Sequence, residues 1–180
     1  MFFVALLLLL MFNSRGFCEE KEAIFEQPLL ITSAGQSAEV QIASILAKRA
    51  GLTYTLSKLA TEKELENIKT LVLVLGTSMK GLGAAGLDKA KEKERVKILI
   101  EVAEEKNMPV FCLHLGGESR RGKLSDEMIN AFLPFAKMAV VVKSGNKDGL
   151  FTKICEENKI PLTEVEKAAQ ALKPFKEAFK

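Results

Sequence analysis

Short runs of continuous apolar residues that end abruptly in small or polar residues are the feature of this sequence that most constrains its fold. Four such runs occupy residues 28–33, 70–76, 109–115 and 138–143. Strands that are apolar on both faces are typical of a parallel sheet covered by helices on both sides. A further run at 52–57 is rich in residues that favour strands. The sequence therefore predicts a sheet of about five strands.

The segments between these runs have the apolar spacing of helices. In segment 37–50, apolar residues recur at helical intervals, and Gly51 follows where a C-terminal cap belongs. Segment 95–107 carries a similar apolar stripe. Shorter helices are predicted at 61–68, 126–133, 150–158 and 164–179, with Thr61, Ser125 and Thr163 as the N-caps of the first, second and fourth.

Strands that alternate with helices indicate βαβ units. We predict a single three-layer α/β domain over residues 28–180, Rossmann- or flavodoxin-like, with a roughly five-stranded parallel sheet and helices on both faces. Right-handed crossovers bring all the loops that follow strands to one edge of such a sheet, the carboxyl edge. The common flavodoxin-like strand order, 2-1-3-4-5, is assumed from fold frequency and makes the first and third strands neighbours.

The N-terminus contains an apolar run at residues 2–12, followed by a polar stretch. This length suits the hydrophobic region of a signal peptide and is shorter than the roughly 20 residues of a membrane-spanning helix. We predict a signal peptide at 1–18, cleaved near Cys18, and a linker at 19–27. The protein would then be exported to the periplasm or the cell exterior. An uncleaved N-terminal anchor is the alternative.

Charge and cysteine content exclude several classes of function. Cleavage after Cys18 leaves 25 basic and 23 acidic residues, a net charge of +2 that gives no indication of nucleic-acid binding. We expect no stable membrane span beyond the signal peptide. Cys112 lies in a strand-like run and Cys155 in a predicted helix, so two buried free thiols are favoured over a disulfide. The oligomeric state stays open.

The loops that follow the predicted strands differ from those that precede them. The four loops at 33–37, 76–86, 114–123 and 143–149 are long, polar or glycine-rich, and seven of the twelve glycines lie in the middle two. Glycine allows positive φ angles and close approach of backbone N–H groups to a ligand. Ordinary turns of α/β folds also need glycines, but ligands of open α/β sheets bind at the carboxyl edge. We therefore predict a ligand site at this edge.

The loop at 76–86 spells G-x-G-x-x-G with Gly81, Gly83 and Gly86, but it does not fit a dinucleotide site. In that fingerprint the first glycine follows the first strand of the unit almost at once. Here residues 77–80 separate Gly76 from Gly81, and the strand is the third in the chain. The G-K-[ST] of a phosphate-binding P-loop is also missing. We therefore expect no nucleotide cofactor, and no cofactor of another kind is indicated.

The same loop fits an anion site in outline. Thr77, Ser78 and Lys80 would lie beside the 33–37 turn at a helix N-terminus, where hydroxyls, N–H groups and an ammonium group could bind phosphate or carboxylate. Basic residues after the fourth and fifth strands could hold an oxyanion, or could be a solvated loop paired with Glu118 and Asp126. The predicted ligand-binding residues are Ser33, Gly35, Gln36, Ser37, Thr77, Ser78, Lys80, Gly81, Gly83, His114, Gly117, Arg120, Arg121, Lys143, Ser144 and Asn146.

His114 is the single histidine, and it ends a predicted strand at the same edge. It could act as a general acid or base, although a lone histidine is also commonly a hydrogen-bonded structural residue. The sequence has no G-x-S-x-G motif, no second histidine for a zinc site and no C-x-x-C pair, so no metal site is predicted. Binding of a small anionic molecule is the first hypothesis. A small hydrolase or transferase that uses His114 is the alternative.

Four long blocks of the sequence resemble a family of small bacterial proteins catalogued as domain of unknown function 6305. The blocks are LLITSAGQSAEV, TLVLVLGTSMKGLGAAGLD, GGESRRGKLSDE and VVKSGNKDGLFTKICEENKIPLT. The resemblance extends over roughly residues 26 to 175. Proteins of this family generally carry signal peptides, so the resemblance implies an exported protein, and it implies no particular reaction, ligand or catalytic residue.

Overall fold

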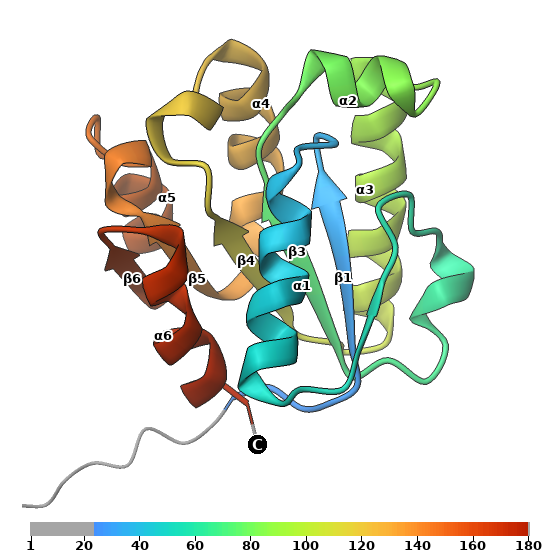
Figure 1. Cartoon of the computed structure of the whole chain (residues 1–180). Helices are drawn as coiled ribbons and strands as arrows, with labels where there is room; N and C mark the ends of the chain where they lie inside the picture. The colour runs from blue at the N-terminus through green and yellow to red at the C-terminus, as the bar shows by residue number, and fades with distance from the viewer. Residues whose placement is uncertain (1–23, 180) are drawn as a thin grey trace, which may run out of the picture.

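The computed structural model describes residues 24–179, which form a six-stranded, entirely parallel sheet between two layers of helices (Figure 1). The strand order is β2-β1-β3-β4-β5-β6. This confirms the predicted fold class, and the assumed order of the first five strands is correct. The strands are β1 (Leu29–Ala34), β2 (Tyr54–Leu56), β3 (Thr70–Leu75), β4 (Val110–His114), β5 (Ala136–Val142) and β6 (Leu162–Val165).

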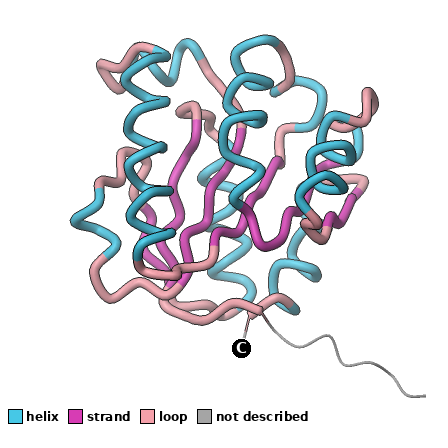
Figure 2. Tube along the Cα trace, turned by 180° about the vertical axis from the view of Figure 1, so that it is seen from behind, coloured by secondary structure: helices cyan, strands magenta, loops and turns pink. Residues whose placement is uncertain are grey.

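Helices cover both faces of the sheet. The α-helices are α1 (Glu39–Ala50), α2 (Met79–Ala84), α3 (Lys89–Glu105), α4 (Lys123–Phe132), α5 (Leu150–Asn158) and α6 (Leu172–Glu177). Short 3₁₀ turns are η1 (Glu62–Leu65), η2 (Gly117–Arg120), η3 (Leu133–Phe135), η4 (Lys143–Gly145) and η5 (Ala168–Ala171). Helices α1 and α6 pack on one face, and α3, α4 and α5 pack on the other (Figures 1 and 2).

Each face of the sheet has its own apolar core, because successive side chains of a strand point to opposite faces. In β3, Leu71 and Leu73 belong to the core under α3, α4 and α5, whereas Val72 and Val74 belong to the core under α1 and α6. Every residue of β1 and β3 is buried. The continuous apolar runs in the sequence therefore report a sheet that is covered on both faces.

The two ends of the described chain are joined in the second core. Phe25 pairs with Phe179 in an isolated parallel bridge, and the Phe25 N–H donates to the Ala178 carbonyl at 3.0 Å. The Phe25 and Phe111 rings meet edge to face with centroids 5.0 Å apart. Phe25 is fully buried, so packing begins inside the segment 19–27 that the sequence suggested as a linker.

Three local predictions are wrong. Residues 162–165 form β6 and pair with β5, Val140 opposite Thr163, so Thr163 is a strand residue and not a helix N-cap. Pairing satisfies a row of backbone groups that would otherwise remain free along β5, and it overrides the local capping pattern. Ser125 lies inside α4, which begins at Lys123 after the N-cap Gly122. Residues 79–84 form α2, not irregular loop.

Other local predictions are confirmed. The Thr61 N–H donates to Glu64 Oε2 at 2.6 Å in the predicted capping box, and Gly51 ends α1 in a left-handed conformation with φ 75°. Cys112 and Cys155 are both free and buried, and burial raises the pKa of Cys155 to about 11.

The predicted signal peptide and its cleavage near Cys18 lie outside the described residues. Between residues 24 and 179, none of the helices has the length and apolar character needed to cross a bilayer.

Candidate functional site

The carboxyl ends of β1 and β3 lie side by side, as the assumed strand order requires. The turns that follow them are locked together by backbone hydrogen bonds. Gln36 and Thr77 form an antiparallel bridge, and the Ser78 N–H donates to the Gly35 carbonyl at 2.8 Å. The predicted meeting of the 33–37 turn with the loop after β3 is therefore observed, and it occurs through main-chain contacts.

Glycines make this close approach possible. A Cβ atom on Gly35, which has a φ of +113°, would lie 2.5 Å from the Gly76 carbonyl oxygen. A Cβ atom on Gly81 would collide with the Gln36 carbonyl oxygen, so this glycine lets α2 pack against the neighbouring turn. At Gly83 and Gly86 a Cβ would meet nothing within 4 Å. The apparent dinucleotide motif thus contains one glycine required by contact, and that contact is with protein backbone.

Two buried hydroxyl groups at these turns have no hydrogen-bond partner. Ser37 Oγ and Thr77 Oγ1 are the two buried side-chain polar atoms within residues 24–179 that lack one. The backbone of both residues is fixed, because the Ser37 N–H donates to Ser33 Oγ at 3.0 Å and the Thr77 N–H donates to Ser125 Oγ at 2.9 Å. A buried polar group left unpaired costs about 1–3 kcal/mol, so two such groups at one sheet edge mark a candidate site.

An ion pair joins the turn after β4 to the first residue of α1, two positions after Ser37. Arg120 Nε is 2.8 Å from Glu39 Oε1, and the Arg120 side chain is 31% exposed. A Cβ atom built on Gly76 would lie 3.5 Å from Ser37 Oγ and 3.6 Å from Arg120 Cβ. The structure therefore brings residues from the turns after β1, β3 and β4 together. We call Ser37, Gly76, Thr77 and Arg120 the β1–β3 site.

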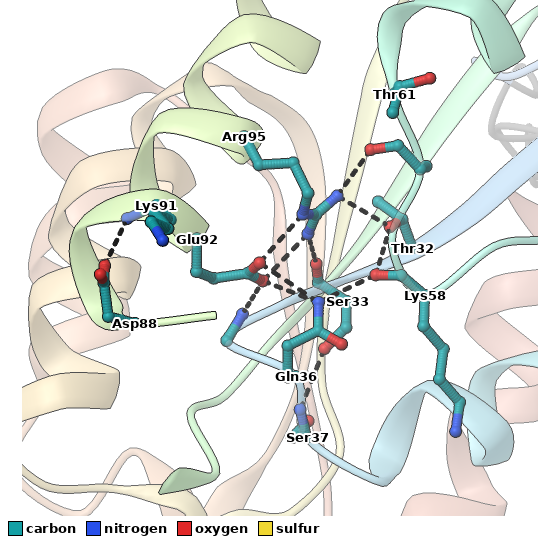
Figure 3. A network of polar contacts seen from close by, with 12 residues as sticks. Thr32, Ser33, Gln36, Ser37, Lys58, Thr61, Asp88, Lys91, Glu92 and Arg95 are labelled. Carbon is teal, nitrogen blue, oxygen red and sulfur yellow. Dashed lines mark hydrogen bonds and ion pairs between the residues drawn. The ribbon is translucent and has the colours of Figure 1, made fainter. Parts of the chain in front are cut away.

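A buried carboxylate binds the turn that carries Ser37 (Figure 3). Glu92, in α3, is 1% exposed and accepts hydrogen bonds from the Gly35 N–H at 2.8 Å and from Gln36 Nε2 at 3.1 Å. Arg95 completes an ion pair with it, with Nε 2.9 Å from Glu92 Oε2. Neither residue is among the predicted site residues, because both lie in a strongly charged helical run. The available signal was spacing, since Glu92 shares the buried stripe of Val96 and Ala103.

The other predicted cations are mostly paired with carboxylates. Arg121 contacts Asp126 at 2.7 Å and Asp148 at 2.7 Å, and its guanidinium group lies 5.7 Å from the centroid of the Phe151 ring. These carboxylates hold the pKa of Arg121 above its usual value, and Arg121 lowers the pKa of Asp148 to about 2. Lys143 pairs with Glu166 at 3.2 Å. Lys80 is exposed and makes no ion pair within the described chain.

The remaining predicted residues after β4 and β5 bind each other and α5. Asn146 Nδ2 donates to Thr152 Oγ1 at 2.7 Å, and Asn146 Oδ1 accepts the Phe151 N–H at 2.8 Å. Ser144 Oγ accepts the Glu118 N–H at 3.4 Å, and Gly117 has a φ of +56° and packs against Ser144. These contacts organise the edge beyond β4 and leave the β1–β3 site as the part with free polar groups.

His114 is in the interior. It is 0% exposed, its ring packs on Phe151 with centroids 4.9 Å apart, and burial lowers its pKa. Nδ1 lies 2.9 Å from the Leu75 carbonyl oxygen and Nε2 lies 3.1 Å from the Gly117 carbonyl oxygen. A neutral imidazole carries one N–H, so it can donate to one of these carbonyls at a time. Across residues 24–179, no group of three or more His, Cys, Asp or Glu residues is placed to hold a metal ion.

The sequence profile of a domain of unknown function, DUF6305, matches residues 26–179. The chain belongs to this family. The match begins one residue after Phe25 and ends at Phe179, two residues beyond α6, so it spans nearly all of the domain described above. Among curated proteins, none matches the sequence significantly.

Several solved structures show a distant likeness to this DUF6305 protein. One is a putative lipolytic protein of the G-D-S-L family from Desulfitobacterium hafniense, 11% identical, covering 76% of this chain and 75% of that one with a TM-score of 0.35. Another is a putative acylhydrolase from Bacteroides fragilis, 9% identical, covering 81% and 72% with a TM-score of 0.36. At these identities and TM-scores the similarity is too low to assign an activity to DUF6305.

Proposed function

We propose that the DUF6305 domain binds a small ligand that carries a carboxylate or phosphate group, at the β1–β3 site. The observation that carries this proposal is the pair of buried hydroxyls without partners, Ser37 Oγ and Thr77 Oγ1. A hydroxyl group donates to an acceptor oxygen, and a carboxylate or phosphate supplies several. Ligands of open α/β sheets also bind where the connections after two neighbouring parallel strands run to opposite sides of the sheet, as those from β1 to β2 and from β3 to β4 do here.

The backbone at this edge favours an anion. Helix α1 begins next to Ser37, and its N-cap Ala38 supplies no side-chain hydrogen bond, so the positive end of the helix dipole is free of a local cap. Glu39 in the first turn is held by Arg120. The Arg120 side chain is 31% exposed, so its remaining N–H groups can donate to an oxyanion while Nε stays paired with Glu39.

Local charge limits the kind of ligand. Arg120 balances Glu39 and Arg95 balances Glu92, whereas Lys80, three residues after Thr77, has no ion pair among residues 24–179 and supplies one excess cation near the β1–β3 site in the sequence. A single excess cation supports binding of a group with one negative charge better than binding of a polyphosphate. The apolar run at residues 2–12 supports export, so we place this binding outside the cytoplasm.

The binding test compares paired variants in a thermal-shift and calorimetric titration with sodium acetate, inorganic phosphate and a series of small carboxylic acids. The wild type should gain melting temperature with at least one of them, because a ligand that binds only the folded state stabilises it. Ser37→Ala and Arg120→Gln should lose most of that gain. Lys143→Gln, which alters an exposed ion pair outside the site, should keep it. Equal behaviour of Arg120→Gln and Lys143→Gln would count against the proposal.

The second candidate is a small hydrolase or transferase. Gln36 has a left-handed φ of 58°, so Ser37 follows a strained strand-to-helix turn of the kind found at functional sites. An acid or base role for His114 requires that its ring leave the Leu75 and Gly117 carbonyls. Turnover of an ester or phosphoester panel that disappears in both Ser37→Ala and His114→Asn supports this candidate. Turnover that persists in Ser37→Ala contradicts it.

A further inference from the structure

The buried pair of Glu92 and Arg95 is unusual for two charged residues in the first half of a long helix. Their side chains are 1% and 12% exposed. Replacing a buried ion pair by apolar residues of similar volume is often neutral or stabilising, because both charges lose hydration. Stability of the fold is therefore a weak reason for this pair. Its contacts point to a more specific role.

The Glu92 carboxylate binds the turn that carries Ser37. Its Oε1 accepts the Gly35 N–H at 2.8 Å and the Gln36 side-chain amide at 3.1 Å, and Oε2 lies 3.2 Å from the same amide nitrogen. Figure 3 shows the carboxylate facing the Gln36 side-chain amide on one side and the Arg95 guanidinium on the other. Charge-assisted hydrogen bonds of this kind are about twice as strong as neutral ones.

Arg95 extends the contact to two more segments. Its Nη1 donates to the Ala60 carbonyl at 2.9 Å, and its Nη2 donates to the Ser33 carbonyl at the end of β1. Gln36 Nε2 also donates to the Lys58 carbonyl at 2.9 Å. The pair thus joins the end of β1, the segment after β2 and α3 around one turn (Figure 3).

That turn needs external support. Gly35 has a φ of 113° and Gln36 a φ of 58°, and a residue with a Cβ atom held in the left-handed region costs roughly 1–2 kcal/mol. The next residue is Ser37, whose hydroxyl is free. A change in the φ and ψ angles at Gly35 and Gln36 would redirect the Ser37 side chain and break the bridge from Gln36 to Thr77.

We infer that Glu92 and Arg95 are positioning residues for the β1–β3 site, and that they hold Gly35 and Gln36 in the left-handed conformations that keep the Ser37 and Thr77 hydroxyls in place. The pair does not touch the ligand. Its part in ligand binding rests on the proposed function, whereas its hold on the turn is a property of the protein without ligand.

The first test is amide hydrogen exchange by NMR in the ligand-free protein. Glu92→Gln keeps the side-chain volume and removes the charge that binds the turn. Glu94→Gln is the matched control, because Glu94 lies two residues away on the same helix and is exposed. The readout is the exchange rate of the Gly35 amide divided by that of Leu73, at the centre of the sheet. This ratio should rise about ten-fold or more in Glu92→Gln and stay unchanged in Glu94→Gln.

The ratio separates positioning from general support of the fold. If Gly35 and Leu73 accelerate together, Glu92 merely stabilises the domain and the inference is overturned. It is also overturned if Gly35 exchanges in the wild type as fast as an exposed loop amide. Should Glu92→Gln fail to fold, Gln36→Ala removes one of the donors to Glu92 at a position that is 8% exposed, and the same rise in the ratio is expected.

The second test is binding of acetate and inorganic phosphate to the same three proteins. Affinity should fall about ten-fold in Glu92→Gln and be unchanged in Glu94→Gln. If neither probe binds the wild type, the proposed function loses its support, and the exchange ratio still decides whether Glu92 holds the turn. If a probe binds the wild type and Glu92→Gln equally well, the positioning role is wrong even though the site is real.

Discussion

Replacement of a free hydroxyl by a methyl group should make this protein more stable and less able to bind. In Thr77→Val the side chain keeps its shape, and a buried polar atom without a partner disappears. Leaving a buried hydroxyl unpaired costs about 1–3 kcal/mol, so the unfolding free energy of the ligand-free variant should rise by about 1 kcal/mol. For a domain of this size that is a rise of roughly 2–4 °C in melting temperature.

The matched control is the same substitution at a threonine whose hydroxyl is satisfied. Thr70 is fully buried, and its Oγ1 donates to the Glu26 carbonyl at 2.7 Å. Thr70→Val leaves that carbonyl without its donor, so it should lower the unfolding free energy by about 1 kcal/mol or more. Urea titrations followed by circular dichroism give both values from the shift in midpoint at constant slope.

The two substitutions should thus change stability in opposite directions. A loss in Thr77→Val as large as that in Thr70→Val would refute the reasoning, because it would show that the Thr77 hydroxyl has a partner. The same variant should also lose the melting-temperature gain that the wild type shows with acetate or phosphate. Greater stability together with weaker binding is the expected signature of a group kept for its ligand.

Other predictions concern the packing of α2 and two pH ranges. Gly81→Ala should lower the unfolding free energy by more than about 1 kcal/mol, whereas Gly83→Ala, which meets nothing within 4 Å, should raise it by roughly 0.5–1 kcal/mol; urea titration measures both. Burial lowers the pKa of His114, so as the pH falls the imidazole is protonated in the unfolded chain before it is protonated in the folded one. The unfolding free energy should therefore decrease below about pH 6.5. His114→Asn should lack that part of the decrease. Arg121 holds the pKa of Asp148 at about 2 in the folded protein, below the pKa of about 3.9 that Asp has in an unfolded chain. The pair therefore stabilises the fold above about pH 3.9, and this stabilisation is lost as the pH falls toward 2. Acid unfolding of Asp148→Asn should lack that step.

The layered fold could be predicted because strands that are buried on both faces appear in the sequence as continuous apolar runs. Residues 71–75 are apolar without interruption, and with Thr70 they form a central strand whose every residue is buried. The edge strand β6 has no such apolar run, since its residues are only half-buried or exposed. Thr163 in β6 and Glu166 just after it have the spacing of a helix start, and pairing with the free edge of β5 decides between the two structures.

The sequence predicted where the candidate site lies better than it predicted which side chains there are free to bind a ligand. Strand order places Ser37 beside Thr77, and that order was assumed from the frequency of the flavodoxin-like fold rather than shown by the sequence. Ion pairing is decided by contacts between distant segments, such as that between Arg121 and Asp148, so the sequence could not show which cations are neutralised. Glu92 was missed for the same reason, because its partners Gly35 and Gln36 lie 56 or more positions away.

The bridge between Phe25 and Phe179 holds the two ends of the described chain next to each other. Both ends of the described chain leave from the amino edge of the sheet, opposite to the turns after β1 and β3 (Figure 1). A tether, a fusion partner or a surface-immobilisation tag added at either end would therefore leave the β1–β3 site facing outward. A circular permutant that links residue 179 to residue 24 through a short spacer should fold with that site unchanged, and new ends would be tolerated in an exposed loop of the same amino edge.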